Sequence, residues 1–586
     1  MHVCRHQTRG FSLVEVIVVS ALVTLMFSGL FAGVRVMVEL IGTSKAESGA
    51  RSLAIAKLEY IRSLPYDSVG TTGGIPDGPL PQTATTTLNG ITYTERILVQ
   101  YLDRPEDGFG IDDENGVTED SKTVKVEYSW VLRGSEESLA LATDIIPNGI
   151  ESTTGGGTLF INVFDANVQP VADANVRVFN DTGTSTIDVT VQTNANGIAN
   201  FPGAPPLSGY QITATKAGYS TDQTYSSTPT NSSPNPPHVS VLTGTVSTVN
   251  FAIDALSSLL ITAFTPPQTE TYEDTFDDMS GVVNASDVTT SGGALVLSGS
   301  AGTYSASGEA YSLTSEPSLL DSWDTFDLVG STTPNTAFTV HLYSVTGSGT
   351  STSYTLIPDA VLPQNSTGFS DGPVDIEGVS TATYPRLALG ATLTSSDPNE
   401  TPSLDSWSIT HVTERTPLSD VTFDIIGNKT IGEHGGSPVL KYENAVTTDG
   451  SGEVQLSGLE WDLYTITVDG AAEGYDIVEV EGLLPYTLEP GVADELVFTL
   501  DTHTAHSLHV SVVDADGSLI SGAEVVLAGD GFSETATTGT YGQVFFGGLS
   551  ADTYTVTVTT AGYGEYVENS VPISGQTQMT VELNLE

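Results

Sequence analysis

The sequence has 586 residues, too many for one hydrophobic core, so we expect several domains. Its 72 acidic and 18 basic residues give a net charge of −54, and a surface this anionic repels phosphate backbones, which excludes nucleic acid from the expected partners. The single cysteine, Cys4, excludes an intramolecular disulfide. Frequent glycine, proline, threonine, serine and valine favour strands and turns. The acidic balance suits a secreted surface or, alternatively, a salt-loving host.

The N-terminal region joins a short basic segment to a long apolar one. Residues 1–10 are polar and basic, and the 19 residues from Val16 to Val34 carry no charge. As a helix this run is about 28 Å long, enough to cross a bilayer. Basic residues before the span and an acidic bulk after it predict a cytoplasmic N-terminus, with the remainder of the chain outside. We therefore expect residues 16–34 to lie in the membrane.

The helix is predicted to continue beyond the membrane. No proline interrupts residues 11–66 before Pro65, so an unbroken helix is permitted. In its second half Ala54, Leu58 and Ile61 fall on one stripe between charged residues. We expect this half to pack against a partner layer outside the membrane.

Glu15 lies at the cytoplasmic end of the apolar run. A carboxylate in hydrocarbon costs about 2.5–3.5 kcal/mol, less near an end, and usually has a partner. Either the side chain reaches the headgroups, or it has a specific partner.

The string from Arg9 to Glu15, RGFSLVE, resembles the processing site of type IV prepilins and of type II secretion pseudopilins. The resemblance implies that residues 1–10 are a leader, that a prepilin peptidase cuts between Gly10 and Phe11, and that the new amino group of Phe11 is methylated. Glu15 would then neutralise the terminal amine of a neighbouring pilin subunit. The resemblance also implies insertion into the inner (cytoplasmic) membrane, followed by assembly into an extracellular filament at the cell surface.

Residues 67–147 are predicted to form a small, pilin-like β domain on the helix, with strands at 92–101 and 123–132. The loop 103–120 between them holds eight acids and three glycines, as a flexible calcium site requires. Pseudopilins and some pilins hold calcium in a comparable place, and a solvated acidic loop is the alternative. The candidate calcium ligands are Asp103, Asp107, Asp112, Asp113 and Glu114.

Beyond a turn-rich linker, one pattern occurs in three copies. Residues 163–178 and 512–527 align without a gap, and in each copy a tyrosine is followed by Gly-Tyr eight and nine residues later. A third copy follows Tyr464, with two residues inserted. These units resemble carboxypeptidase regulatory-like domains and Cna B-type stalk modules, which implies β sandwiches and leaves the ligand open. Their expected bounds are 157–253, 416–501 and 505–586.

Residues 257–413 differ from the repeats. Alternating apolar residues predict a larger sandwich of jelly-roll type, loosely similar to carbohydrate-binding sandwiches. Trp323 and Trp407 could stack on sugars if exposed, and we expect them in the core.

We interpret His503 and its neighbours His506 and His509 as linker residues rather than a zinc site.

The sequence has no recognisable catalytic motif, so we expect no enzyme activity. The predicted fold is mainly β and multidomain, with a long N-terminal pilin-type helix, a small β domain and about four sandwich modules. We interpret the chain as a minor type IV pilin that displays these modules for adhesion, because about 430 further residues on each subunit would crowd a major-pilin fibre. Its expected partners are the prepilin peptidase, other pilin subunits, and a surface glycan or protein. The alternatives are a type II secretion pseudopilin and an anchored surface protein that does not polymerise.

Overall fold

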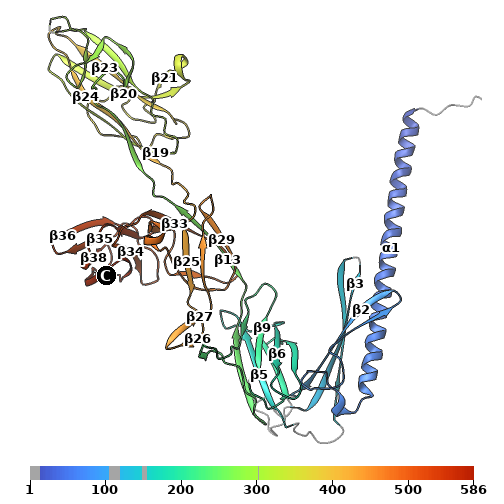
Figure 1. Cartoon of the computed structure of the whole chain (residues 1–586). Helices are drawn as coiled ribbons and strands as arrows, with labels where there is room; N and C mark the ends of the chain where they lie inside the picture. The colour runs from blue at the N-terminus through green and yellow to red at the C-terminus, as the bar shows by residue number, and fades with distance from the viewer. Residues whose placement is uncertain (1–12, 105–118, 133, 148–154, 301, 586) are drawn as a thin grey trace, which may run out of the picture.

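The computed structural model describes residues 13–104, 119–132, 134–147, 155–300 and 302–585. One long helix lies at one end of the molecule, and a row of β domains leads away from it (Figure 1). The expected fold class, mainly β with one long N-terminal helix and several sandwiches, is confirmed.

The helix α1 (Leu13–Arg62) is followed by a 3-10 turn (Tyr66–Ser68) and an antiparallel sheet of order β1-β2-β3-β4. Asn89 and Gly90 both have positive φ, as a two-residue hairpin turn between β1 and β2 requires. The second half of α1 packs on β3 and β4, and we call this unit the N-terminal domain. Its strands are β1 (Thr83–Leu88), β2 (Ile91–Leu102), β3 (Ser121–Leu132) and β4 (Ser135–Ile145).

The first module is a sandwich of two sheets, β12-β5-β8 and β10-β9-β6-β7. Its first strand pairs in parallel with its last strand and antiparallel with β8. Alternating valines and isoleucines of both sheets form its core. The strands are β5 (Gly157–Phe164), β6 (Asn175–Asn180), β7 (Ile187–Gln192), β8 (Ile198–Ala204), β9 (Gln211–Thr215), β10 (Asp222–Gln223) and β12 (Val246–Ala252).

The third module repeats this pattern with sheets β37-β34-β40 and β36-β35-β38-β39. Again the first strand pairs in parallel with the last. The strands are β34 (Ser507–Asp514), β35 (Glu524–Gly529), β36 (Phe532–Thr537), β37 (Gln543–Phe546), β38 (Asp552–Thr559), β39 (Tyr566–Ile573) and β40 (Gln576–Leu583).

The second module has the same pairing, and its first strand corrects the expected boundary at residue 257. The strand β13 (Ser257–Phe264) pairs in parallel with β33, the last strand, and antiparallel with β29. Residues 257–264 therefore belong to this module and not to the 257–413 domain. The remaining elements are β25 (Thr422–Gly427), β26 (Thr430–His434), β27 (Ser437–Leu440), β28 (Glu443–Thr447), β29 (Glu453–Leu459), β30 (Asp462–Thr467), α2 (Gly470–Glu473), β31 (Tyr475–Val480), β32 (Tyr486–Leu488) and β33 (Ala493–Thr502).

A whole domain is inserted between the first two strands of the second module. In the first and third modules a short loop closes there with bridges Phe164–Pro170 and Val513–Leu519. In the second module the corresponding bridge joins Phe264 to Pro417, and the intervening residues fold separately. A surface loop tolerates such an insertion because its two ends remain adjacent.

The inserted domain is a sandwich of two antiparallel sheets, β16-β17-β24-β19-β22 and β15-β18-β23-β20-β21, with β14 paired to β24. Trp323 and Trp407 are fully buried in its core, as expected. Its strands are β14 (Thr269–Asp274), β15 (Val282–Ser286), β16 (Val288–Thr290), β17 (Leu295–Leu297), β18 (Ser307–Ser312), β19 (Leu320–Ser331), β20 (Thr336–Thr346), β21 (Ser353–Leu356), β22 (Val374–Asp375), β23 (Leu387–Ser395) and β24 (Ser403–Thr413).

Candidate functional site

The first half of α1 is exposed along its whole length. Every described residue from Leu13 to Ile41 is exposed, including the many apolar ones. Within the described part of the chain, α1 is the one helix long and apolar enough, by length and composition, to cross a membrane, and none of that stretch is buried. Glu15 lies in its first turn. The predicted cleavage site, Gly10 and Phe11, lies outside the described residues.

The second half of α1 packs on the sheet through a stripe of small and apolar residues. Ala54, Leu58 and Ile61 are buried, as the stripe predicted, and Ala46, Gly49 and Ala50 extend it toward the N-terminus. The Tyr93 hydroxyl donates a hydrogen bond to the carbonyl of Ala46 at 2.9 Å. Small side chains let the helix approach the sheet this closely.

A buried charge also joins the helix to the sheet. Lys57 Nζ lies 2.9 Å from Glu95 Oε1, and the Glu95 side chain is only 5% exposed. The Tyr128 hydroxyl donates to the same carboxylate, and burial together with this hydrogen bond raises the pKa of Tyr128. The hydroxyl therefore remains a proton donor at neutral pH.

The acidic loop begins and ends at buried residues. Asp103 is buried on one side, and Glu119 and Asp120 are buried on the other, while Asp107, Asp112, Asp113 and Glu114 lie outside the described residues. Within the described residues no group of three His, Cys, Asp or Glu side chains is arranged to hold a metal ion. The calcium site therefore stays a prediction.

Lys122, which the sequence analysis missed, lies beside this loop and is fully buried. Its Nζ donates to the carbonyls of Tyr66 and Val69, each at 2.9 Å, and lies 4.5 Å from the centre of the Tyr66 ring. Burial lowers the pKa of Lys122 to about 8. Lys122 lies in a strand with alternating burial, and nothing in the sequence indicated that this lysine would be buried.

The first module is joined to the N-terminal domain by hydrogen bonds and by an apolar contact. The amide of Asp188 donates to the carbonyl of Gly73 at 2.7 Å, and Gln82 Nε2 donates to the carbonyl of Asp188 at 2.6 Å. Ile75 of the same glycine-rich segment is buried in the core of the first module. The two domains therefore share apolar surface as well as hydrogen bonds.

The first and second modules are joined by strand pairing across about 200 residues of sequence. The strand β11 (Ser233–Pro234) pairs with β26 (Thr430–His434), which pairs in turn with β27 (Ser437–Leu440). Asn231 Nδ2 and the amide of Asn235 both donate to the carbonyl of Ile431, at 2.9 and 3.0 Å. Gly432 has φ +147°, and a Cβ there would lie 2.2 Å from Asn231 Oδ1, so the contact requires glycine.

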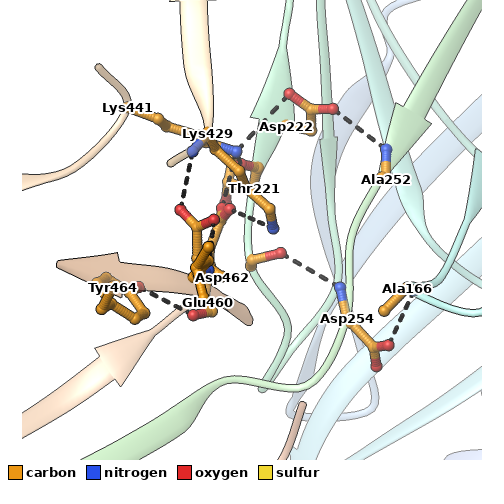
Figure 2. A network of polar contacts seen from close by, with 12 residues as sticks. Ala166, Thr221, Asp222, Ala252, Asp254, Lys429, Lys441, Glu460, Asp462 and Tyr464 are labelled. Atoms are coloured by element: carbon orange, nitrogen blue, oxygen red, sulfur yellow. Dashed lines mark hydrogen bonds and ion pairs between the residues drawn. The ribbon is translucent and has the colours of Figure 1, made fainter. Parts of the chain in front are cut away.

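Next to this pairing, Lys441 and Lys429 share one carboxylate (Figure 2). Lys441 Nζ lies 2.8 Å from Glu460 Oε1 and 3.8 Å from Asp222 of the first module, and it donates to the carbonyl of Thr221 at 3.1 Å. Lys429 Nζ lies 3.2 Å from Glu460 Oε2. These are the last two basic residues of a strongly acidic chain, and both serve one joint.

Burial shifts the charges of this joint toward neutrality. Desolvation raises the pKa of the Asp222 carboxyl, and the charge of Lys441 partly opposes the rise. Desolvation also lowers the pKa of Lys429, and Glu460 opposes that change. The side chains of Lys441, Asp222 and Glu460 are each about one-fifth exposed. Partly buried pairs of this kind are weak evidence for stabilisation, because the cost of desolvation offsets the attraction between the charges.

A cleft of about 690 Å³ opens between the two modules beside this joint. The size is typical of small-ligand sites, and the lining is mixed polar and apolar. Tyr225, Asn235 and His238 of the first module face Lys429 and Lys441 of the second across it. The lysines are already paired with carboxylates, so the cleft presents hydrogen-bonding groups rather than net positive charge.

The second and third modules meet at a buried carboxylate, Asp476. It accepts hydrogen bonds from His503 Nδ1 at 2.7 Å, from the amide of Thr504 at 2.9 Å and from Gln576 Nε2 at 2.5 Å. Nearby, Nε2 of the buried His509 lies 3.2 Å from Gln543 Oε1, and burial lowers the pKa of His509 to about 4. Two of the three clustered histidines thus belong to a structural joint.

Comparison with known families identifies two of the modules. The carboxypeptidase regulatory-like domain family matches residues 158–254 and 507–586, which are the first and third modules. The resemblance expected from the repeats is confirmed there. The second module shares the strand pairing and is not matched by that family. No match was found among curated proteins.

Several solved structures show weak similarity to the chain. The Bacillus anthracis TIE protein is 12% identical, with 86% of this chain and 73% of that chain covered and a TM-score of 0.15. BcpA, the major pilin subunit of Bacillus cereus, is 12% identical, with 74% and 100% covered and a TM-score of 0.14. GBS52, the minor pilin of Streptococcus agalactiae, is 16% identical, with 30% and 86% covered and a TM-score of 0.12. Similarity at this level establishes neither the function of the chain nor the arrangement of its modules.

Proposed function

We propose that the chain is a minor type IV pilin that displays β-sandwich modules at the cell surface for adhesion. The observation that carries this proposal is the exposed apolar half of α1, residues 13–41, which continues into a half that is packed on a sheet. An apolar surface of that length is stable only in lipid or among other apolar helices. A pilin-type helix meets both conditions, in the inner membrane before assembly and in the filament afterwards.

The processing residues complete this proposal. A prepilin peptidase cuts between Gly10 and Phe11 and methylates Phe11, and Glu15 pairs with the terminal amine of the neighbouring subunit. The support is the sequence string itself together with the position of Glu15 in the first turn of α1, at the start of the exposed apolar surface. The N-terminus faces the cytoplasm before processing, and the modules lie outside.

The joints between domains suit a projecting arm. Each joint described above uses backbone groups or buried polar side chains, so the modules hold defined orientations rather than hanging on loose linkers. Such an arm carries its modules away from the filament axis. The bulk of such an arm favours a sparse or terminal position in the filament, and the role is non-enzymatic.

We also propose calcium in the acidic loop of the N-terminal domain. Asp103 and Asp120, at the two ends of the loop, are both buried, and calcium favours clustered carboxylates of this kind. Asp103 together with Asp107, Asp112, Asp113 and Glu114 would supply the oxygen ligands. When bound, the ion would offset the mutual repulsion of these acids.

The proposal is tested in host cells with and without their prepilin peptidase. We expect the chain in the sheared filament fraction of peptidase-positive cells, at low abundance relative to the major subunit. Without the peptidase we expect a longer chain that stays with the membranes. A chain that reaches the sheared fraction equally in both strains, or that forms the bulk of the filament, would contradict the proposal.

A further inference from the structure

One face of the inserted domain carries a cluster of tyrosines. Tyr311 of β18, Tyr343 of β20 and Tyr354 of β21 all lie on the five-stranded sheet and are half-buried. The Tyr311 ring centre is 5.2 Å from that of Tyr343 and 4.6 Å from that of Tyr354. The three rings therefore form one continuous aromatic surface, which we call the tyrosine face.

This surface is separate from the core. Along β20 the buried residues Phe338, Val340 and Leu342 alternate with His341 and Tyr343, so the tyrosines point away from the sandwich interior. The outer face of an antiparallel sheet is usually polar. Three adjacent aromatic rings on that face mark a binding surface, because aromatic side chains gather at interfaces where one side is apolar and the other wet.

The central strand β23 is shaped to receive the rings. Gly390 lies opposite Tyr311 on one side and His341 on the other. A Cβ on Gly390 would lie 2.6 Å from Tyr343 Cε2 and 2.9 Å from Tyr311 Cε1. Ala388, opposite Tyr343, is fully buried. Small residues under the rings let them pack directly on the central strand, as a platform on the outer face of the sheet.

Hydrogen-bonding groups surround the platform. The Tyr343 hydroxyl interacts with that of Tyr311, and burial with this contact raises the pKa of Tyr343 to about 12, so the hydroxyl is protonated. Arg386, the only basic residue among 19 acidic ones in residues 265–414, lies close enough to Tyr354 to lower its pKa in part.

These features select the chemistry of the ligand. Aromatic rings stack on the C–H faces of sugars, and hydroxyl, imidazole and guanidinium groups at their edges bind sugar hydroxyls. The strongly acidic surroundings repel polyanions, so the ligand carries no run of negative charge. An aromatic surface that spans β18, β20 and β21 suits an extended chain rather than a single small molecule.

We propose that the tyrosine face binds a neutral polysaccharide. The inserted domain lies at the end of the row of domains opposite to α1, where an extended surface glycan is accessible (Figure 1). The proposal rests on the proposed adhesive function, for which it names the ligand class and the site.

The test uses the full chain in detergent micelles, run through native gels that contain laminarin, dextran, mannan or a neutral galactan, with alginate as the anionic comparison. We expect retardation by at least one neutral polysaccharide and none by alginate. The double variant Tyr311→Ala/Tyr343→Ala should weaken this binding at least tenfold. Tyr343→Phe, which keeps the ring, should weaken it less, and Tyr541→Ala in the third module should leave it unchanged.

The single variant Tyr354→Ala provides a second test in case the double variant does not fold. Tyr354 lies on the edge strand β21, so its removal does not disturb the central strands. It should weaken binding several-fold with an unchanged melting temperature. No retardation by any of the neutral polysaccharides, binding to alginate alone, or equal binding by the tyrosine variants would overturn the inference. Filament incorporation of the same variants is measured separately, so a failed glycan test with normal incorporation leaves the pilin proposal standing.

Discussion

The two halves of α1 have one continuous backbone and opposite surroundings. Residues 13–41 expose apolar side chains on every side, whereas the half from Ala46 to Ile61 buries a narrow stripe of small residues against the sheet. A stripe on one side is typical of a helix that packs on its own protein. An apolar surface all round is typical of a helix surrounded by lipid or by other helices, so the first half is built for contacts outside this chain.

The largest effect that follows from this contrast concerns Glu15. On the pilin proposal we expect Glu15→Ala to reduce incorporation into filaments at least tenfold, because it would remove the proposed charge partner of the neighbouring subunit's amine. Glu47→Ala is the matched control, since Glu47 lies in the second half and makes an exposed pair with Arg51 at 3.6 Å. Immunoblots of sheared filaments measure both. Equal incorporation of the two variants would remove the chemical basis for a filament role of the first half.

A stability effect tests the packed half. Lys57→Met removes the cationic partner of the buried Glu95, and we expect a loss of about 2–3 kcal/mol in the free energy of unfolding of the N-terminal domain. Lys45→Met, at an exposed position of the same helix, is the control and should change it by less than about 0.5 kcal/mol. Denaturant titration of the full chain in micelles measures the difference. Similar values for both variants would mean that the ion pair does not hold the helix on the sheet.

A smaller packing effect compares two glycines of α1. A Cβ at Gly49 would lie 2.6 Å from Tyr93 Oη, whereas nothing lies within 4 Å of one at Gly33. We therefore expect Gly49→Leu to destabilise the N-terminal domain by about 1–3 kcal/mol and to leave membrane insertion intact. Gly33→Leu should not affect this domain and should instead alter assembly. The reverse pattern in melting and incorporation assays would show that the halves are assigned to the wrong environments.

The last effect concerns calcium and depends on the ion concentration. If the acidic loop binds the ion, adding calcium at about 100 times its Kd should stabilise the N-terminal domain by about 2.7 kcal/mol at most. The variant Asp112→Asn/Asp113→Asn should abolish the calcium-dependent rise in melting temperature. Magnesium at the same concentration is the control ion. A melting temperature of the unaltered chain that does not change with calcium would contradict calcium binding and favour the alternative of a solvated acidic loop.

Local patterns predicted the local structure well. The strands expected at 92–101 and 123–132 are β2 and β3, which extend by one or two residues, and the helix stripe and the buried tryptophans are as expected. These features depend on neighbours in the sequence, so periodicity and composition are sufficient to find them. The internal repeat likewise located the first and third modules, which the family comparison matches.

Contacts between residues far apart in the sequence could not be predicted from the sequence alone. The strand β13 belongs with β29 and β33, about 195 and 235 residues later, and no local signal separates it from the domain that follows. Asp222 and Lys441 meet only because two modules dock. The tyrosine face could not be predicted either, because Tyr311, Tyr343 and Tyr354 become neighbours only through the order of the strands in the sheet.

The most direct test of the central claim is the intact mass and N-terminal sequence of the protein sheared from the cell surface. The account predicts a chain that begins at Phe11 with an N-methyl group and is recovered in the filament fraction. A chain that still begins at Met1 and remains with the membranes would contradict it, and the protein would then be an anchored surface protein that does not polymerise.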